Sequence, residues 1–162
     1  MTNTIGIDIS PNMVARFDSL AASAGLPPSR LCAVVGDLLC TPPTPSVSAP
    51  PFFGFDVAAV CVGFHHFADA ALATRRLAER LKPGGVLLIV DFLGTRKEDV
   101  PEEMRKTVRV GGFEEEEMKE LFEGAGLLEF GFSLLEEKVV MEMKGERKER
   151  TVFMARGRKP GK

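Results

Sequence analysis

The chain has 162 residues, and its composition excludes several classes of protein. Hydrophobic residues make up 44% and charged residues 27%, which is typical of a folded globular protein and not of a disordered one. The net charge of −2 gives no reason to expect a nucleic acid as the partner. No apolar run approaches the roughly 18 residues of a membrane span, and no secretory signal is recognisable. We therefore expect a single domain over residues 1–162, and the three scattered cysteines favour free thiols in the cytoplasm.

Four apolar runs predict β-strands in the first part of the chain. They are too continuous for a sheet that is wetted on one face, so they indicate parallel strands covered on both faces by helices. The runs span residues 5–9, 31–35, 57–64 and 86–92.

A first helix is predicted directly after the first strand. Ser10 is a typical cap, and Pro11 is suited to the first helical position because its missing N–H costs nothing there. Gly25 is the expected stop. The apolar face of this helix comprises Met13, Phe17, Leu20, Ala21 and Ala24.

Two further helices are predicted later in the chain. Asp69 caps the second, which the turn Lys82-Pro83-Gly84-Gly85 ends before the next strand. The third runs from about Glu114 to Gly124, and its Glu residues favour the positive N-terminal end of the helix. Gly126 is the expected left-handed cap.

The remaining segments complete the prediction of an α/β fold with right-handed crossovers. Strands are predicted over residues 127–135 and 151–155, joined by a charged linker over 136–150 that we interpret as a solvated hairpin extension. A proline-rich loop covers residues 41–54 and is expected to be a stiff surface insertion. Residues 158–162 form a basic tail.

Polar residues close the apolar runs, at the edge where ligands bind in such sheets. Asp8 ends the first run, and its carboxylate suits either the two hydroxyls of a ribose or a helix-capping turn. Asp37 follows the second run, and suits either an exocyclic amine or local turn chemistry. Asp91 lies within the fourth run.

His65 and His66 follow the third run. Two adjacent histidines cannot share one metal comfortably, and no third ligand is spaced for it, so we expect no metal. A structural or pocket-lining role is one interpretation, and a base near neutral pH is the other.

Several motifs in order resemble the class I S-adenosylmethionine-dependent methyltransferases, and most closely the small-molecule methyltransferases of the ubiquinone and menaquinone biosynthesis type found in fungi. The resemblance covers roughly residues 4–157. The motifs are Gly6-Ile7-Asp8-Ile9-Ser10-Pro11-Asn12-Met13, Gly36-Asp37, residues 55–67 with His65-His66, Lys82-Pro83-Gly84-Gly85, and the late helix from Phe113 to Gly126.

The resemblance implies a Rossmann-like fold, S-adenosylmethionine as cofactor and a small-molecule methyl acceptor. It also implies a role for each matching residue. Asp8, with Ile9 beside it, would hold the ribose hydroxyls. Asp37 and the Leu38 N–H would contact the adenine. Met13 would pack near the adenine, although an ordinary core methionine fits equally well. Gly63 would line the methionine end of the cofactor, His65 and His66 would be the catalytic candidates, and the Lys-Pro-Gly-Gly turn would be structural.

One departure from the family pattern concerns the first strand and helix. The family begins with a strand and a Gly-x-Gly-x-Gly loop, and this sequence contains no such loop. In the family the absent strand lies between those at residues 4–9 and 57–63, so its loss would leave two buried edges unpaired. Each buried, unsatisfied backbone group costs about 1–3 kcal/mol, against a total stability of about 5–15 kcal/mol.

Three outcomes are open for these edges: the two halves close on each other, another chain completes the sheet, or the chain is an incomplete gene product, which we favour. The activity of this chain on its own is therefore doubtful. Two alternative functions are a non-catalytic methyltransferase-like module or partner subunit, and a nicotinamide dinucleotide-binding domain.

Overall fold

The computed structural model describes residues 3–41, 44, 47–94, 112–143 and 146–161. The chain forms two compact units, Met1–Phe53 and Gly54–Lys162, and each is described by itself. The single domain over residues 1–162 stays a prediction. None of the helices in the described residues is long and apolar enough to cross a membrane.

The first unit is built on two parallel strands joined by a helix. Strand β1 (Thr4–Asp8) leads into helix α1 (Pro11–Ser23), strand β2 (Leu31–Val35) follows, and a short 3-10 helix η2 (Pro50–Phe52) comes near the end. The Ser10 Oγ accepts a hydrogen bond from the Met13 N–H at 3.4 Å, which confirms the predicted cap with Pro11 at the first position. Gly25 has φ +71°, so the predicted stop is also confirmed.

The predicted apolar face of α1 is largely exposed. Ala21 is the one buried residue of this helix, whereas Met13 is 51% and Leu20 62% exposed. Most members of the apolar face that the sequence indicates are therefore exposed in the first unit. The spacing of apolar residues identifies which face of a helix is hydrophobic. It does not indicate which element packs against that face.

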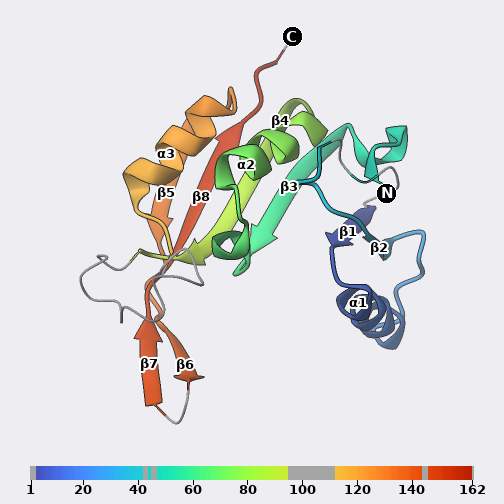
Figure 1. Ribbon diagram of the computed structural model, residues 1–162, viewed down its shortest axis with the longest axis horizontal. Coiled ribbons are helices and arrows are strands. Elements are labelled where there is room, and N and C mark those ends of the chain that lie inside the picture. Colours follow the sequence, from blue (N-terminus) through green and yellow to red (C-terminus); the bar gives the residue numbers. More distant parts are fainter. Residues whose placement is uncertain (1–2, 42–43, 45–46, 95–111, 144–145, 162) are drawn as a thin grey trace. The chain divides into compact units, whose positions relative to one another are not determined.

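The second unit contains a four-stranded sheet in the order β3-β4-β8-β5. Strands β3 and β4 are parallel, and β8 runs antiparallel to both of its neighbours. Helices α2 and α3 lie side by side on one face of the sheet (Figure 1). The elements are β3 (Phe55–Cys61), the 3-10 helix η3 (Phe64–His66), α2 (Ala70–Arg80), β4 (Leu81–Phe92), α3 (Glu115–Gly124), β5 (Leu128–Leu134) and β8 (Val152–Arg158).

Among the described residues of this unit, helices cover one face of the sheet, and coverage of the other face stays a prediction. Along β4, Leu87 and Ile89 are fully buried, while Leu88 and Val90, which alternate with them, are half-buried. Both of the described helices of this unit lie on one face of its sheet (Figure 1). A continuous apolar run shows that both faces of a strand avoid water, but it cannot show what packs on each.

The strands at residues 4–8 and 55–61 belong to separate sheets. Within the described residues, β1 pairs with β2 alone and β3 with β4 alone. The three outcomes for the edges of these strands stay predictions. Val57 on β3 is 55% exposed, as expected for a strand at the edge of its sheet.

The two local predictions around α2 are confirmed in outline. The Asp69 Oδ1 accepts a hydrogen bond from the Leu72 N–H at 2.8 Å, so Asp69 caps the helix as predicted. The helix ends at Arg80, two residues before the predicted turn. In that turn Gly84 has φ +78°, and a Cβ on Gly85 would lie 2.8 Å from the Phe55 carbonyl oxygen. Both glycines are therefore required by the backbone, which supports a structural role for the turn.

Two other predicted segments have a definite place in the fold. The charged linker forms the antiparallel hairpin of β6 (Val139–Met143) and β7 (Glu146–Arg150), as predicted. In the proline-rich loop, residues 42–43 and 45–46 lie outside the described residues, but Val47 is fully buried and would clash with a Cβ on Gly36. That part of the loop is therefore packed into the first unit and is not a mere surface insertion.

The predicted basic tail begins inside the fold. Arg158 is the last residue of β8, and the Lys159 ammonium caps the C-terminal end of α2. The Lys159 Nζ donates to the carbonyl oxygens of Ala78, Glu79 and Leu81 at 2.9, 3.2 and 2.7 Å. These carbonyls belong to the negative end of the helix dipole, so the ammonium satisfies them in both hydrogen bonding and charge.

Replacing Lys159 with methionine is expected to lower the free energy of unfolding of this unit by about 2 kcal/mol, because three carbonyls lose a charged donor. Amide exchange of the last turn of α2 would measure the loss. Lys119 on α3 is exposed, so Lys119→Met is the matched control and should change exchange little. Equal effects of the two substitutions would contradict the capping role.

Candidate functional site

Asp8 stands at the carboxyl end of β1 with one oxygen in use. The Oδ1 accepts a hydrogen bond from the Ser10 N–H at 2.7 Å, which orients the carboxylate as the chain turns into α1. Among the described residues, Oδ2 has no hydrogen-bond partner, and the side chain is half-buried. Asp8 therefore stabilises the turn through Oδ1 and leaves Oδ2 as a hydrogen-bond acceptor. Such an acceptor suits the hydroxyl groups of a ribose.

Asp37 follows β2 and is held by its own loop. Its Oδ2 accepts from the Cys40 thiol at 3.1 Å and its Oδ1 from the Leu39 N–H at 2.7 Å. These two bonds hold the pKa of Asp37 below its ordinary value, with the thiol as the larger cause. The local turn interpretation of Asp37 is thus seen directly. Each carboxylate oxygen keeps a further lone pair, so recognition of an adenine amino group stays a prediction.

The two carboxylates belong to the same edge of the first sheet. Strands β1 and β2 are parallel neighbours with Asp8 opposite Val35, and the Gly36 N–H donates to the Asp8 carbonyl at 3.0 Å. Asp37 comes immediately after. Both residues therefore lie at the carboxyl ends of neighbouring parallel strands, and a shared adenosine site there stays a prediction.

The other predicted cofactor contacts in this unit are Ile9, Met13 and Leu38. Ile9 and Met13 are exposed near Asp8, whereas the Leu38 side chain is buried behind Asp37. The exposure of Met13 removes the alternative that it is a core methionine. Contact of any of the three with a cofactor stays a prediction.

In the second unit, His65 is bonded to Asp91. Asp91 is fully buried near the end of β4, and its Oδ1 lies 2.7 Å from the His65 Nδ1. The His65 backbone N–H also donates to Oδ2 at 2.9 Å, and the Phe92 N–H donates to Oδ1 at 2.7 Å. One carboxylate thus fixes both the ring and the backbone of His65.

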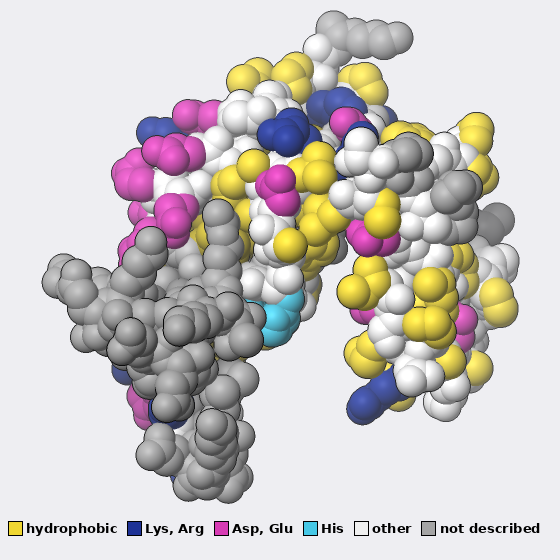
Figure 2. All heavy atoms as spheres, viewed as in Figure 1, with side chains coloured by type: hydrophobic (Ala, Val, Ile, Leu, Met, Phe, Trp, Pro, Cys, Tyr) yellow, Lys and Arg dark blue, Asp and Glu magenta, His cyan; other side chains and the backbone are white. Residues whose placement is uncertain are grey.

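His66 and Gly63 flank this pair. The ring of His66 lies 4.0 Å from that of His65 between centroids and is exposed, and the His65 side chain is 12% exposed. Figure 2 shows histidine at the surface of the molecule. Gly63 is the cap of η3, and its carbonyl accepts from the His66 N–H at 3.2 Å. The segment is held at the carboxyl ends of β3 and β4, where ligands are expected.

Two buried residues, Phe64 and Asp91, hold the segment around η3 in place. Phe64 is fully buried against Phe67 and Phe113, so it anchors η3 and does not line an open site. The sequence placed Asp91 among the polar residues at the ligand-binding edge of the sheet but gave it no role. A carboxylate inside an apolar run was the available signal, because a buried charge requires partners.

Val62, at the turn between β3 and η3, has φ +51° and is 46% exposed. A β-branched residue in this region is strained by about 1–2 kcal/mol. We expect Val62→Gly to raise the free energy of unfolding of the second unit by about 1 kcal/mol, measured by exchange of the slowest β4 amides. Cys61→Gly, at an exposed strand position next to it, should lower it instead. A loss of stability in Val62→Gly would contradict the strain.

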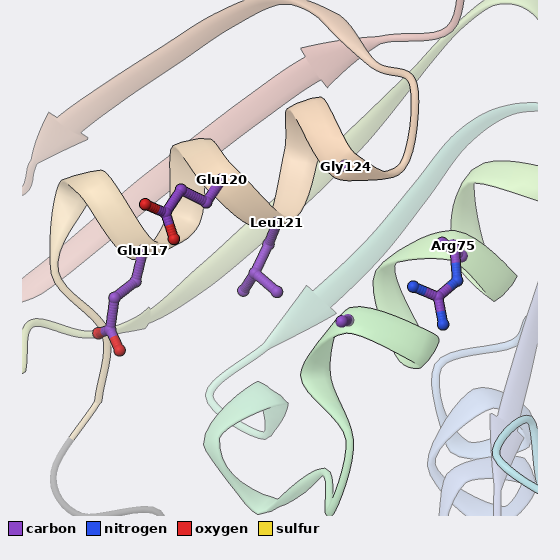
Figure 3. A pocket seen from close by; sticks show the side chains of 6 residues that line it. Arg75, Glu117, Glu120, Leu121 and Gly124 are labelled. Atoms are coloured by element: carbon purple, nitrogen blue, oxygen red, sulfur yellow. The ribbon is translucent and has the colours of Figure 1, made fainter.

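A groove of about 210 Å³ lies in the second unit, between α2 and α3 (Figure 3). Leu121 points from α3 into it, with Glu117 and Glu120 on the same helix and Arg75 on α2. The remaining lining residues are Ala71 and Gly124. None of the predicted site residues lines this groove.

Comparison with known proteins identifies a relative by sequence and solved structures that share the fold of this chain. The chain is 29% identical over 130 residues to an uncharacterized methyltransferase of Schizosaccharomyces pombe, covering 76% of this chain and 45% of that protein. It therefore spans less than half the length of that relative. Two solved structures share the fold. Bacillus subtilis YcgJ has TM-score 0.73 at 17% identity and is covered over 84% of its length, against 99% of this chain. An S-adenosylmethionine-dependent methyltransferase of Methanosarcina mazei has TM-score 0.66 at 16% identity, covering 98% of this chain and 82% of that one.

The family assignment rests on a direct sequence match. The sequence model of the methyltransferase domain family matches residues 1–89, which include β1 to β3, both histidines and most of β4. The mixed sheet with flanking helices agrees with the Rossmann-like fold of the solved neighbours. The chain belongs to the class I S-adenosylmethionine-dependent methyltransferases.

Proposed function

We propose that this chain binds S-adenosylmethionine and transfers its methyl group to a small-molecule acceptor. The observation that carries the proposal is the pair of carboxylates, Asp8 and Asp37, at one edge of the parallel strands β1 and β2 in a chain of this family. The side chain of Asp8 fits the cofactor in a specific way, because Oδ2 has no partner within the described residues and the ribose supplies hydroxyl donors.

The cofactor supplies an electrophilic methyl group on a sulfonium. The chain's own residues have separate tasks. The Asp8 carboxylate accepts hydrogen bonds from the ribose hydroxyls, and Asp37 with the Leu38 N–H recognises the adenine. Gly63 contacts the methionine end, and Ile9 and Met13 supply apolar surface. His65 and His66 are the candidates to take a proton from an acceptor that carries one at neutral pH.

The compartment that we propose is the cytoplasm. Cys32, Cys40 and Cys61 carry free thiols, which supports a reducing environment. The net charge of −2 gives no reason to propose a nucleic acid as the substrate.

Calorimetric titration with S-adenosylmethionine tests the proposal through a matched pair of variants. Asp8→Asn keeps an oxygen for the Ser10 N–H but loses the charge, and we expect micromolar affinity to fall about tenfold or more. Asp18→Asn makes the same change on α1, where the Asp18 Oδ1 accepts from the Ala33 N–H at 2.8 Å, and affinity should stay near that of the native chain. Equal losses in the two variants, or no heat in the native chain, would contradict the proposal.

A second candidate is a non-catalytic methyltransferase-like module whose sheet is completed by a partner chain. Two observations favour it: the sequence has no Gly-x-Gly-x-Gly loop, and among the described residues β3 is an edge strand of its own sheet with Val57 exposed. Absence of heat with S-adenosylmethionine, together with slowed exchange of the β3 amides when a partner is added, would support this candidate. Binding of the cofactor by the chain alone would remove it.

A further inference from the structure

We infer that Asp91 is a positioning residue, which holds His65 with its proton on Nδ1 and leaves Nε2 as the proton acceptor. The inference selects His65 over His66 as the base. Its chemical meaning rests on the proposed function, whereas the tautomer itself is a property of the second unit alone.

The hydrogen bonds around Asp91 determine which ring nitrogen of His65 carries the proton. Backbone N–H groups already donate to each of its oxygens, from His65 at 2.9 Å to Oδ2 and from Phe92 at 2.7 Å to Oδ1. An ionised carboxylate only accepts, so at the 2.7 Å contact with Oδ1 the donor is the His65 Nδ1–H. A neutral imidazole carries one proton, and Nε2 is therefore the nitrogen with the free lone pair.

The surroundings fix the ring as well as the tautomer. The His65 ring lies 5.6 Å from that of Phe92 and 4.0 Å from that of His66, between centroids. The Arg150 guanidinium lies 4.9 Å from the centroid of Phe92. His66, beside the His65 ring, and Arg150, which interacts electrostatically with Asp91, are titratable groups near the pair. The pKa of Arg150 is lowered by burial, and the charge of Asp91 opposes that shift.

The difference between the two histidines is the buried carboxylate. His66 is exposed, and no carboxylate within the described residues is bonded to its ring. When a hydroxyl acceptor is deprotonated, its O–H bond breaks, the electron pair stays on oxygen, and the proton forms a bond with Nε2 of His65. The ring then carries a positive charge, which the Asp91 carboxylate stabilises through the unchanged Nδ1–H bond.

Long-range ¹H–¹⁵N spectra of the full chain labelled at histidine test the inference without any substrate. The chain has two histidines, so His66→Gln assigns them. In alkaline buffer, where the imidazoles are neutral, we expect His65 in the Nδ1–H form. In Asp91→Asn the side-chain amide can donate to Nδ1, so we expect the ¹⁵N frequencies of Nδ1 and Nε2 to exchange places. The spectrum of His66 should not move.

Two results would overturn the inference: His65 in the Nε2–H form in the native chain, or the Nδ1–H form unchanged in Asp91→Asn. If Asp91→Asn does not fold, the native spectrum still decides, because the bonded Nδ1–H proton must be visible and slow to exchange. Failure of the proposed function is distinguishable. The expected tautomer together with no heat on adding S-adenosylmethionine would support the inference and contradict cofactor binding. Heat of binding together with the Nε2–H tautomer would support cofactor binding and contradict the inference.

Discussion

Replacing Phe64 with alanine is expected to lower the free energy of unfolding of the unit Gly54–Lys162 by about 3–5 kcal/mol. The side chain is fully buried, and its ring lies 5.5 Å from that of Phe67 and 5.2 Å from that of Phe113. Its removal leaves a cavity between η3 and the segment that carries Phe113. Because His65 is the next residue, the loss should also loosen the contact with Asp91.

Exchange of the slowest β4 amides in the full chain measures this loss. The chain forms two units and contains no Trp or Tyr, so a single fluorescence transition would not report on this unit. Phe53→Ala, which removes an exposed ring from the other unit, is the control and should leave these amides unchanged. A loss below about 1 kcal/mol in Phe64→Ala would show that η3 is not anchored by this ring.

Replacing Asp91 with alanine is expected to lower the stability of the same unit by about 3 kcal/mol or more, because buried donors lose their acceptor. The donors are the His65 N–H, the His65 Nδ1–H and the Phe92 N–H. Exchange of the slowest β4 amides in the full chain would measure the change.

Asp69→Ala is the matched comparison for this prediction. It also deletes a carboxylate that accepts a backbone N–H, but at the exposed cap of α2, where about 1 kcal/mol is expected. If Asp91→Ala cost no more than Asp69→Ala, the buried carboxylate would not organise the segment around His65.

The sequence predicted those features that depend on neighbours along the chain. The caps at Ser10 and Asp69 and the left-handed Gly126 each follow from the chemistry of one or two residues. The strands follow from apolar runs, and the carboxyl-edge position of Asp8 and Asp37 follows from the parallel order of β1 and β2.

Features that depend on distant parts of the chain could not be predicted in this way. His65 and Asp91 are 26 positions apart, and nothing local to either indicates that they are bonded. The exposure of Leu20 and the burial of Val47 depend on which segments cover them. The absence of the family's first strand and Gly-x-Gly-x-Gly loop was recognised from the order of the family's motifs and not from periodicity, and the outcome for the strand edges beside it stays a prediction.

The central claim is that the acidic edge of β1 and β2 holds the adenosine of S-adenosylmethionine. Amide spectra of the ¹⁵N-labelled full chain, recorded as the cofactor is added, test it most directly. The account predicts concentration-dependent shifts at Asp8, Ser10, Gly36 and Leu38. Shifts confined to the groove between α2 and α3, around Arg75 and Leu121, or no shifts at all, would contradict it.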